Sequence, residues 1–259
     1  MRTYFRRMRY ALLSDVHANL PALEAVLRDV DGREADAILH LGDLVGYAPW
    51  PDEVVHVLRS RGIIGVAGNY DSTVAIGAEH CGCRAESVEQ EAWNQESYNW
   101  TRSRVSAATK AYLRGLPFRL DIRPAGGHAG GPRLILVHGT PTLNTLYWTE
   151  DRPDRFCLEM ADKAGARAGD VIAFGHTHRP WQRTIGGIRF INAGSVGKPK
   201  DGDPRAGYVL VTFHGGDNTV EFIRVDYDVE SAAAAIIEAG LPEPFAHLLQ
   251  TGGRSVQPI

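Results

Sequence analysis

The chain has 259 residues, which suits one large domain, because α/β and sandwich folds of about 200 to 250 residues routinely form around one core. Hydrophobic residues make up 44% and charged residues 23%, which argues against a disordered chain, a collagen or a bare coiled coil. The formal charge of −3, from 28 basic and 31 acidic residues, provides no broad cationic surface, so we expect no obligate nucleic-acid partner.

The cysteines and the N-terminus indicate a cytoplasmic protein. Cys81, Cys83 and Cys157 are an odd number, which does not fit a secreted disulfide framework and predicts a reducing compartment. The apolar run at 11–13 is too short for a signal peptide, and no window approaches the roughly 18 apolar residues of a membrane span, so we expect no membrane partner. We therefore divide the chain into a disordered arm at 1–7, one domain at 8–250 and a frayed polar tail at 251–259.

Strand-like and helical patterns alternate in the first seventy residues, as in βαβ units with a largely parallel sheet. Strands are predicted at 10–13, 37–41 and 63–66. Asn19 can cap a first helix that carries Pro21 in its opening turn, and a second helix should begin near Pro51 and stop at Gly62.

The remainder of the chain predicts one or two helices at 87–113, followed by a half that is richer in antiparallel strands. Strands are expected at 118–122, 134–137, 171–174, 188–191, 208–213 and 220–225. Gly186-Gly187 and the segment 214–218 are hairpin signals, and a C-terminal helix is expected at 229–239.

Five of the apolar runs end in potential metal ligands. Carboxyl ends of strands in open α/β sheets converge on one crevice, so donors far apart in sequence can meet there. The donors are Asp15, His17, Asp43, Asn69, His138, His176 and His178.

Each of these motifs alone also fits a simpler interpretation. Asp15 with His17 can be a cap and a surface imidazole, Gly-Asp and Gly-Asn pairs are ordinary turns, and His138 can end a strand. Together the seven donors suffice for two metal ions that share the Asp43 carboxylate. Carboxylate, imidazole and amide donors without thiolate suit an open catalytic site for manganese first, with iron, zinc, cobalt or nickel as alternatives.

With these motifs in this order, the chain resembles the calcineurin-like metallophosphoesterases, and most of all their small bacterial and archaeal phosphodiesterase-like members. The matching segments are 14–19, Gly42-Asp43, 68–71, His138-Gly139, 175–178 and 192–197. The resemblance implies an α/β fold of four layers, αββα, in which two mixed β-sheets pack together and are flanked by helices.

The resemblance also implies a role for each donor. Asp15, His17, Asp43 and His178 would hold one ion, and Asp43, Asn69, His138 and His176 would hold the other. Asn192 and Ser195 match a loop that borders the site in such proteins, although a glycine-rich turn predicts the same residues.

The chain departs from the monoesterase members at one position. These members carry a histidine after Gly-Asn that can protonate the leaving oxygen, whereas this chain has Tyr70, a poor acid at neutral pH. Asp71, which would orient that histidine, can simply cap a turn. Tyr70 and Asp71 join Asp43 and Asn69 as candidate catalytic residues, and phosphodiesters are favoured over monoesters.

Three further features have two interpretations each. His80, Cys81 and Cys83 could bind a third metal, but buried thiols in a loop explain them better. Four aromatic residues could stack a nucleobase or fill the core, and the core is favoured. Tyr147 and Trp148 follow the His138 motif and could equally form core or rim the pocket. The four aromatic residues are Trp93, Tyr98, Trp100 and Tyr112.

The function that we predict is hydrolysis of a small phosphoester by in-line attack of a hydroxide that bridges two divalent ions about 3.5–4 Å apart. One alternative is a metal-binding interaction module, because a retromer subunit with this fold serves as a scaffold. Others are a phosphomonoesterase or nucleotide phosphatase, and a metallohydrolase for a non-phosphate substrate. The sequence leaves the natural substrate open, and also whether the chain forms a homo-oligomer.

Overall fold

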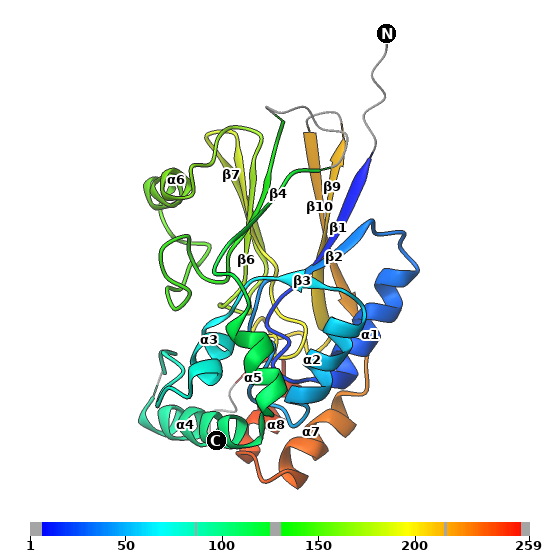
Figure 1. The fold of residues 1–259 in the computed structure, drawn as a ribbon, viewed down its shortest axis with the longest axis vertical. Helices are drawn as coiled ribbons and strands as arrows, with labels where there is room; N and C mark the ends of the chain where they lie inside the picture. The colour runs from blue at the N-terminus through cyan, green and yellow to red at the C-terminus, as the bar shows by residue number, and fades with distance from the viewer. Residues whose placement is uncertain (1–6, 86, 125–130, 215–216, 255–259) are drawn as a thin grey trace.

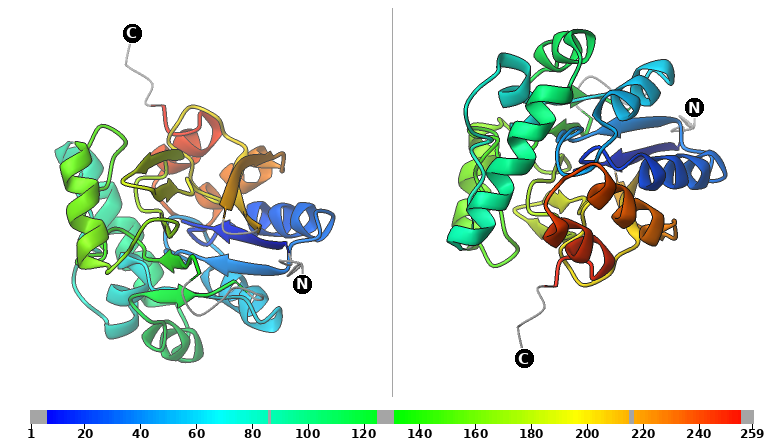
Figure 2. Two further views of the ribbon diagram at one scale, coloured as in Figure 1. Left: turned by 90° about the horizontal axis from the view of Figure 1, so that it is seen from above. Right: turned by 90° about the horizontal axis from the view of Figure 1, so that it is seen from below.

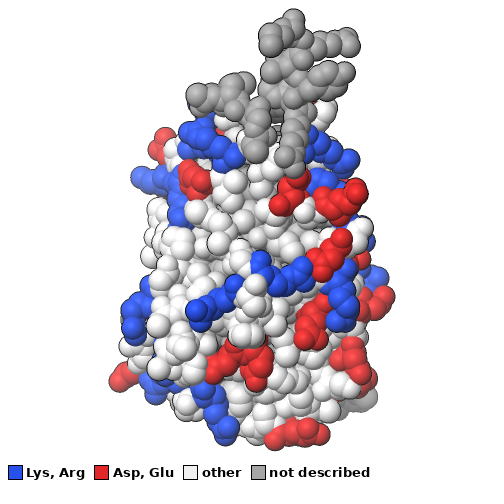
Figure 3. Space-filling model, turned by 45° about the vertical axis from the view of Figure 1, so that its right-hand side comes forward, with Lys and Arg blue, Asp and Glu red and all other residues white. Residues whose placement is uncertain are grey.

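A computed structural model describes residues 7–85, 87–124, 131–214 and 217–254. The expected arm at 1–7 and the end of the expected tail lie almost entirely outside these ranges. Among the described residues, no helix is both long and apolar enough to cross a membrane. Lys and Arg side chains are interspersed with Asp and Glu over the face drawn in Figure 3.

The first sheet is built around the N-terminal strand. Its order is β10-β9-β1-β2-β3, with β1, β2 and β3 parallel and β9 antiparallel to both β1 and β10. Its strands are β1 (Met8–Leu13), β2 (Ala37–His40), β3 (Ile64–Gly65), β9 (Ala206–His214) and β10 (Asp217–Val225).

The second sheet takes its strands from the later half of the chain. Its order is β4-β5-β6-β8-β7, with β5, β6 and β8 parallel and an antiparallel strand at each edge. Its strands are β4 (Leu120–Ile122), β5 (Leu134–Leu136), β6 (Val171–Phe174), β7 (Trp181–Ile185) and β8 (Ile188–Asn192). Gly186 and Gly187 form the β7–β8 turn with positive φ angles, as the hairpin signal predicted.

The alternation of side chains along the strands creates the layers. Tyr10 and Leu12 of β1 face the second sheet and pack in the core between the sheets, whereas Ala11 and Leu13 face the helices on the other side. Helices α1 (Leu20–Asp31) and α2 (Pro51–Ser60) cover the outer face of the first sheet, and α6 (Asp154–Lys163) covers that of the second (Figure 1). The predicted αββα architecture is therefore confirmed.

The remaining helices gather at one end of the sheets, which is the lower end in Figure 1 and faces the viewer in the right-hand view of Figure 2. The parallel strands point toward this end. The helices there are α3 (Asn69–Ile76), α4 (Val88–Arg104), α5 (Ala107–Arg114), α7 (Val229–Glu238) and α8 (Glu243–Gln250).

Most predicted elements are present with boundaries that shift by a few residues. Asn19 caps α1 by accepting from the Ala22 N–H, and the segment 87–113 forms two helices, α4 and α5. The sequence analysis did not predict α3, α6, α8 or β7. The start of the predicted frayed tail is instead anchored, because Gly202 N–H donates to the Gly252 carbonyl and Gly253 N–H to that of Leu248.

Candidate metal centre

The predicted ligands come together where strands of both sheets end. The turn after β1 is bonded to the turn after β2, because Asp15 N–H donates to the Gly42 carbonyl and His17 N–H to that of Asp43. The turn after β6 joins them, since His176 N–H donates to Asp15 Oδ2 at 3.0 Å. Backbone bonds between turns thus fix the positions from which the side chains project.

Five of the seven predicted ligands have left-handed backbone conformations. Their φ angles are positive at Asp15 (50°), His17 (49°), Asp43 (53°), His176 (66°) and His178 (59°). Such conformations are uncommon for residues other than glycine and concentrate at functional sites, where the surrounding structure holds them. Each turn leaves its strand sharply, which is how His176 and His178 can both face inward although they are only two residues apart.

The turn after β6 approaches the turn after β1 so closely that it explains the glycine at position 175, next to the predicted ligands. A Cβ on Gly175 would lie 1.8 Å from Ser14 Oγ and 2.4 Å from Asp15 Oδ2. A side chain there would separate the β6 turn from the β1 turn and break the Asp15 contact. The glycine of the Gly-His-Thr-His motif is therefore required by packing, since its φ angle is not in the left-handed region.

The first cluster contains Asp15, His17 and His178, all buried. Asp15 Oδ1 lies 3.2 Å from His178 Nε2 and 3.8 Å from His17 Nε2. The two Nε2 atoms face each other at 3.1 Å. One carboxylate oxygen and two imidazole nitrogens thus converge on one point.

The second cluster contains Asp43, His138 and His176, with Asn69 beside them. His138 Nε2 is 3.4 Å from Asp43 Oδ2 and 3.1 Å from Asn69 Oδ1. Asp43 Oδ2 is also 3.7 Å from His17 Nε2, while Asp43 Oδ1 accepts from the Tyr70 N–H. A single oxygen of Asp43 therefore lies between the two clusters.

Hydrogen bonds made by the Nδ1 atoms of three histidine rings direct the lone pairs of the opposite Nε2 atoms into the site. The Nδ1 atoms of His17, His138 and His178 lie 3.1, 2.7 and 2.6 Å from backbone carbonyl oxygens of Val45, Leu41 and Lys198. A carbonyl only accepts, so each neutral ring carries its proton on Nδ1 and presents the Nε2 lone pair inward. His176 Nε2 is buried and makes no hydrogen bond with any described residue. The ring nitrogens and the carboxylate oxygens that face one another in the clusters are all hydrogen-bond acceptors, and such a set of atoms suits a cation bound between them.

The protonation states agree with this picture. Burial and then the adjoining His178 lower the pKa of His17 to about 3, so this imidazole is neutral at pH 7. Burial also opposes protonation of His138, but Asp43 and then Asp15 outweigh it and raise its pKa to about 9. Burial likewise disfavours the charge on Asp15, yet His178 holds the pKa of that carboxyl below its usual range. The buried carboxylates thus favour a positive charge among them, either a proton or a metal ion.

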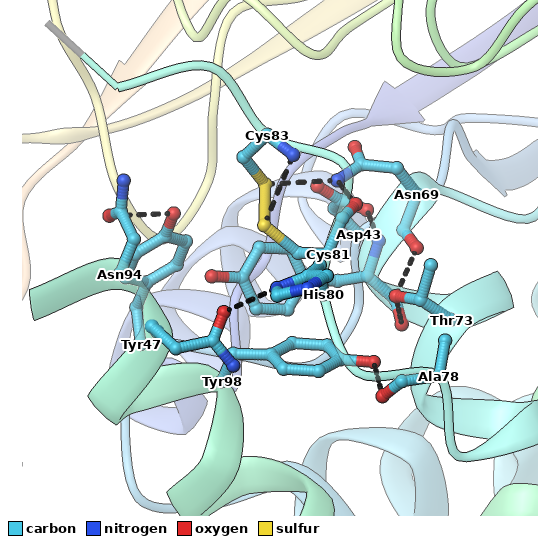
Figure 4. The surroundings of a disulfide bond; sticks show 12 residues. Asp43, Tyr47, Asn69, Thr73, Ala78, His80, Cys81, Cys83, Asn94 and Tyr98 are labelled. Carbon is cyan, nitrogen blue, oxygen red and sulfur yellow. Dashed lines mark hydrogen bonds between the residues drawn. A yellow bond between two sulfur atoms is a disulfide. The ribbon is translucent and has the colours of Figure 1, made fainter. Parts of the chain in front are cut away.

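Asn69 begins α3, and the loop after that helix holds its side chain. Its Nδ2 donates to the Cys81 carbonyl at 3.0 Å and to Cys83 Sγ at 3.2 Å, which turns Oδ1 toward His138 (Figure 4). The amide nitrogen is therefore engaged by the loop while the oxygen remains directed at the second cluster.

Cys81 and Cys83 form a disulfide across Gly82, so the interpretation of these two residues as buried thiols is wrong (Figure 4). An odd number of cysteines argues against a disulfide framework that spans the chain, but two cysteines separated by one glycine can pair locally. Cys157 is the one described cysteine that is free, and it is buried. His80 Nδ1 instead lies 2.9 Å from Gln95 Oε1, so these three residues do not form a third metal cluster.

Tyr70 and Asp71 lie beside the clusters in fully buried positions. Burial raises the pKa of Tyr70 well above its usual value, and Tyr47 adds to this, which makes the phenol an even weaker acid than the sequence predicted. Asp71 accepts from the N–H groups of Leu44 and Gly68 at 2.8 and 2.9 Å. It therefore ties two site turns together, in agreement with a capping role, while catalytic roles for both residues stay predictions.

The two aromatic residues after the His138 motif separate into the two roles that the sequence left open. The Tyr147 ring lies 4.2 Å from the His176 ring between centroids and lines the cleft above the clusters. Trp148 is fully buried and stacks on Phe174 at 4.4 Å. Tyr147 therefore lies at the rim of the cleft, and Trp148 belongs to the hydrophobic core.

Asn192 and Ser195 support the site from behind. Asn192 Nδ2 donates to the Gly175 carbonyl at 2.7 Å, and Ser195 Oγ donates to the Asp15 carbonyl at 2.7 Å. Both are buried and fix the backbone of the ligand turns. The four aromatic residues of 93–112 pack in or against the first core, as predicted, with Tyr98 fully buried.

Sequence reasoning missed Lys198, which lines the cleft although it is only 7% exposed. Its ammonium lies 3.8 Å from the centroid of the Tyr47 ring and 5.1 Å from that of Phe245. Its carbonyl accepts from His178 Nδ1, so this residue both orients a predicted ligand and places a cation beside the clusters. The position in a glycine-rich loop directly before Pro199 was the only signal.

This arrangement defines a class of protein: an αββα fold with two adjoining Asp/His clusters at the strand ends, suited to metal-dependent hydrolysis. The family model for the calcineurin-like phosphoesterase superfamily domain matches residues 8–216. The chain therefore belongs to the calcineurin-like phosphoesterases, whose members act on phosphoesters and typically bind two divalent metal ions.

Several relatives are similar over most of the chain. An uncharacterized protein, MJ0912, of Methanocaldococcus jannaschii is 30% identical over 248 residues, which are 90% of this chain and 93% of that protein. Phosphodiesterase YfcE of Escherichia coli is 26% identical over 207 residues, 76% of this chain and 84% of that protein. A metallophosphoesterase structure from Sphaerobacter thermophilus has 32% identity and a TM-score of 0.71, with 95% of this chain and 100% of that chain covered.

Proposed function

We propose that this protein is a phosphodiesterase with a dinuclear metal centre. The proposal rests on one observation. In each cluster the imidazole nitrogens and the carboxylate oxygens converge on one position, and a single oxygen, Asp43 Oδ2, lies between the two positions. Asp15, His17, Asp43 and His178 would hold one ion. Asp43, Asn69, His138 and His176 would hold the other.

When bound, two divalent ions stabilise charge on phosphoryl oxygens and activate water for in-line displacement. Manganese is our first candidate, because the donors are carboxylate and amide oxygens with imidazole nitrogens, and both cysteines that lie near the clusters are joined in a disulfide. The carbonyls of Leu41, Val45 and Lys198 fix the imidazoles, as outer partners of metal ligands commonly do.

Preference for diesters rests on the position after Asn69. The phenol of Tyr70 has a pKa raised well above 10, so at neutral pH it cannot deliver a proton to an alkoxide leaving group at a useful rate. Diesters with a stable leaving anion need this proton least. Similarity to YfcE of Escherichia coli, a phosphodiesterase, supports the same preference.

The test combines metal analysis with an aryl diester and an alkyl monoester. We expect two ions per chain, hydrolysis of bis(4-nitrophenyl) phosphate that chelation abolishes and manganese restores, and weaker hydrolysis of glycerol 1-phosphate, whose alkoxide leaving group needs a proton. His138→Ala should lose metal from the second cluster preferentially. Full activity after removal of all metal would contradict the proposal.

The same experiment discriminates the alternatives. Bound metal without hydrolysis of any ester would favour an interaction module, and hydrolysis of amides alone would favour a metallohydrolase for another substrate. A higher rate with the monoester than with the diester would favour a phosphomonoesterase.

A further inference from the structure

A large groove adjoins the metal cleft and takes no part in the proposed chemistry. Its volume is ≈ 680 Å³, within the range of about 300–1,000 Å³ that is typical of small-molecule sites. The cleft over the clusters holds only ≈ 20 Å³, so a reacting phosphoryl group fits there but the body of a substrate does not. Gln90, Lys198 and Lys200 line both spaces and connect them.

One side of the groove is cationic and is anchored to the metal centre. Arg179, Lys198 and Lys200 line it, whereas Glu243 is the one carboxylate among the described residues that line the groove. Lys200 N–H donates to the His178 carbonyl at 3.2 Å, and Arg179 Nε donates to the Lys200 carbonyl at 2.9 Å. The backbone of Lys200 and the guanidinium of Arg179 are therefore held in place relative to a predicted metal ligand.

The other side of the groove is largely apolar. Trp93 of α4 is half-buried and lines the groove together with Pro244 and Leu248 of α8. Both helices belong to the helical end of the molecule (Figure 2). An indole face and aliphatic carbons suit a flat ring, as in nucleic-acid complexes where bases stack on aromatic side chains.

We infer that this groove binds the non-reacting part of the substrate, and that this part is a nucleoside phosphate, with its ring against Trp93 and its additional phosphate at Arg179, Lys198 and Lys200. The inference rests on the proposed phosphodiesterase activity and extends it to a substrate class. Lys198 and Lys200 line both the cleft and the groove, so a phosphate held by these cations lies beside the scissile phosphate.

The test uses three diesters with the same 4-nitrophenolate leaving group on the metal-loaded protein. They are methyl 4-nitrophenyl phosphate, thymidine 5′-(4-nitrophenyl phosphate) and its 3′-phosphorylated form. We expect kcat/KM to increase at each step, by roughly tenfold for the added phosphate, mainly through KM, and more strongly at low salt. Equal kcat/KM values for all three would overturn the inference and leave the phosphodiesterase proposal intact, whereas no hydrolysis of any would contradict the latter.

Variants assign the effect to the groove. Arg179→Met should reduce the ratio of kcat/KM between the phosphorylated and unphosphorylated nucleoside esters by roughly threefold, since Lys198 and Lys200 remain, and Trp93→Leu should reduce the ratio between the nucleoside and methyl esters. Lys163→Met, an exposed position on α6, is the matched control and should change neither ratio. Ratios unchanged in both groove variants would overturn the inference.

A binding experiment separates the groove from catalysis. Thymidine 3′,5′-bisphosphate should raise the Tm of the metal-free protein, and Arg179→Met should weaken that shift, because a ligand that binds the native state stabilises it. Thymidine alone should produce a smaller shift. An equal shift in the wild type and Arg179→Met would place the ligand elsewhere and contradict the inference.

Discussion

The floor and the sides of the cleft are built in different ways. The floor of the cleft consists of the ligand turns. Its residues, such as Asp15 and Asp43, are buried, have left-handed φ angles and are each held by several hydrogen bonds. Lateral residues such as Gln90 and Trp93 come from helices and are half-buried, and Arg179 is exposed. The difference indicates that the chemistry of the site is encoded in rigid turns, while selectivity is encoded in segments that can change without disturbing them.

The largest effect should come from the floor. Asp43→Ala removes an oxygen that faces both clusters and also the acceptor of the Tyr70 N–H, so we expect loss of both metals and a fall in kcat/KM of about 10³-fold or more. Metal analysis and the bis(4-nitrophenyl) phosphate assay measure both. A variant with two ions and near-normal turnover would show that our assignment of the floor is wrong.

Tyr70→His tests the one floor position where the chain departs from the monoesterase pattern. General acids contribute roughly 10²–10⁴-fold, but Asp71 is engaged by two backbone amides and would orient an imidazole imperfectly. We therefore expect the ratio of kcat/KM for the alkyl monoester glycerol 1-phosphate to kcat/KM for the aryl diester bis(4-nitrophenyl) phosphate to increase by roughly tenfold. Tyr70→Phe, which keeps the ring, is the control and should leave the ratio unchanged; a ratio that does not increase with histidine contradicts the missing-acid explanation.

The contact between floor and loop should give a smaller effect. Cys83→Ala removes the sulfur that accepts from Asn69 Nδ2 and breaks the disulfide, so the amide is held less firmly. Loss of such an outer partner typically costs 10–100-fold in metal affinity, and we expect about tenfold at the second cluster, measured by competition with a chelator. Cys157→Ala, a buried position on α6, should leave the affinity unchanged. Equal affinities in both variants would mean that the loop does not position Asn69.

The floor could be predicted from sequence because its signals are local. Asp15, Asp43, His138 and His176 follow apolar strands directly, and parallel strands place their ends together. The sheets and the helices α1 and α2 followed from periodicity in the same way. The left-handed turns and the lone-pair directions depend on bonds between turns that lie far apart in sequence.

The sides of the cleft could not be predicted because they depend on packing over long distances. Lys198 reaches the site only because Tyr47 and Phe245, from opposite ends of the chain, support its ammonium. Helix α3 was missed because a turn signal opens it and its short sequence has almost no amphipathic pattern. Helix α6 had a usable signal, since Cys157, Met160 and Ala161 form a buried stripe at helical spacing.

The last effect concerns a buried residue behind the floor and is visible in stability alone. His40 of β2 is fully buried with its ring against Gly65, and burial lowers its pKa from the ordinary 6.5 to about 4. Between these pH values the unfolded chain binds a proton that the folded protein does not, so the His40 contribution is complete above pH 6.5 and is lost as the pH falls toward 4.

We expect His40 to account for about 2 kcal/mol of the stability that the metal-free protein loses between pH 7 and pH 5. His40→Gln removes the titrating group, so its free energy of unfolding, measured with urea, should fall by that much less over the same interval. His56→Gln, an exposed position on α2, is the matched control and should follow the wild type. His17 and His176 also have lowered pKa values, but they are present in all three proteins, so the difference between variants isolates His40. Parallel pH profiles for wild type and His40→Gln would show that this imidazole does not titrate in that window.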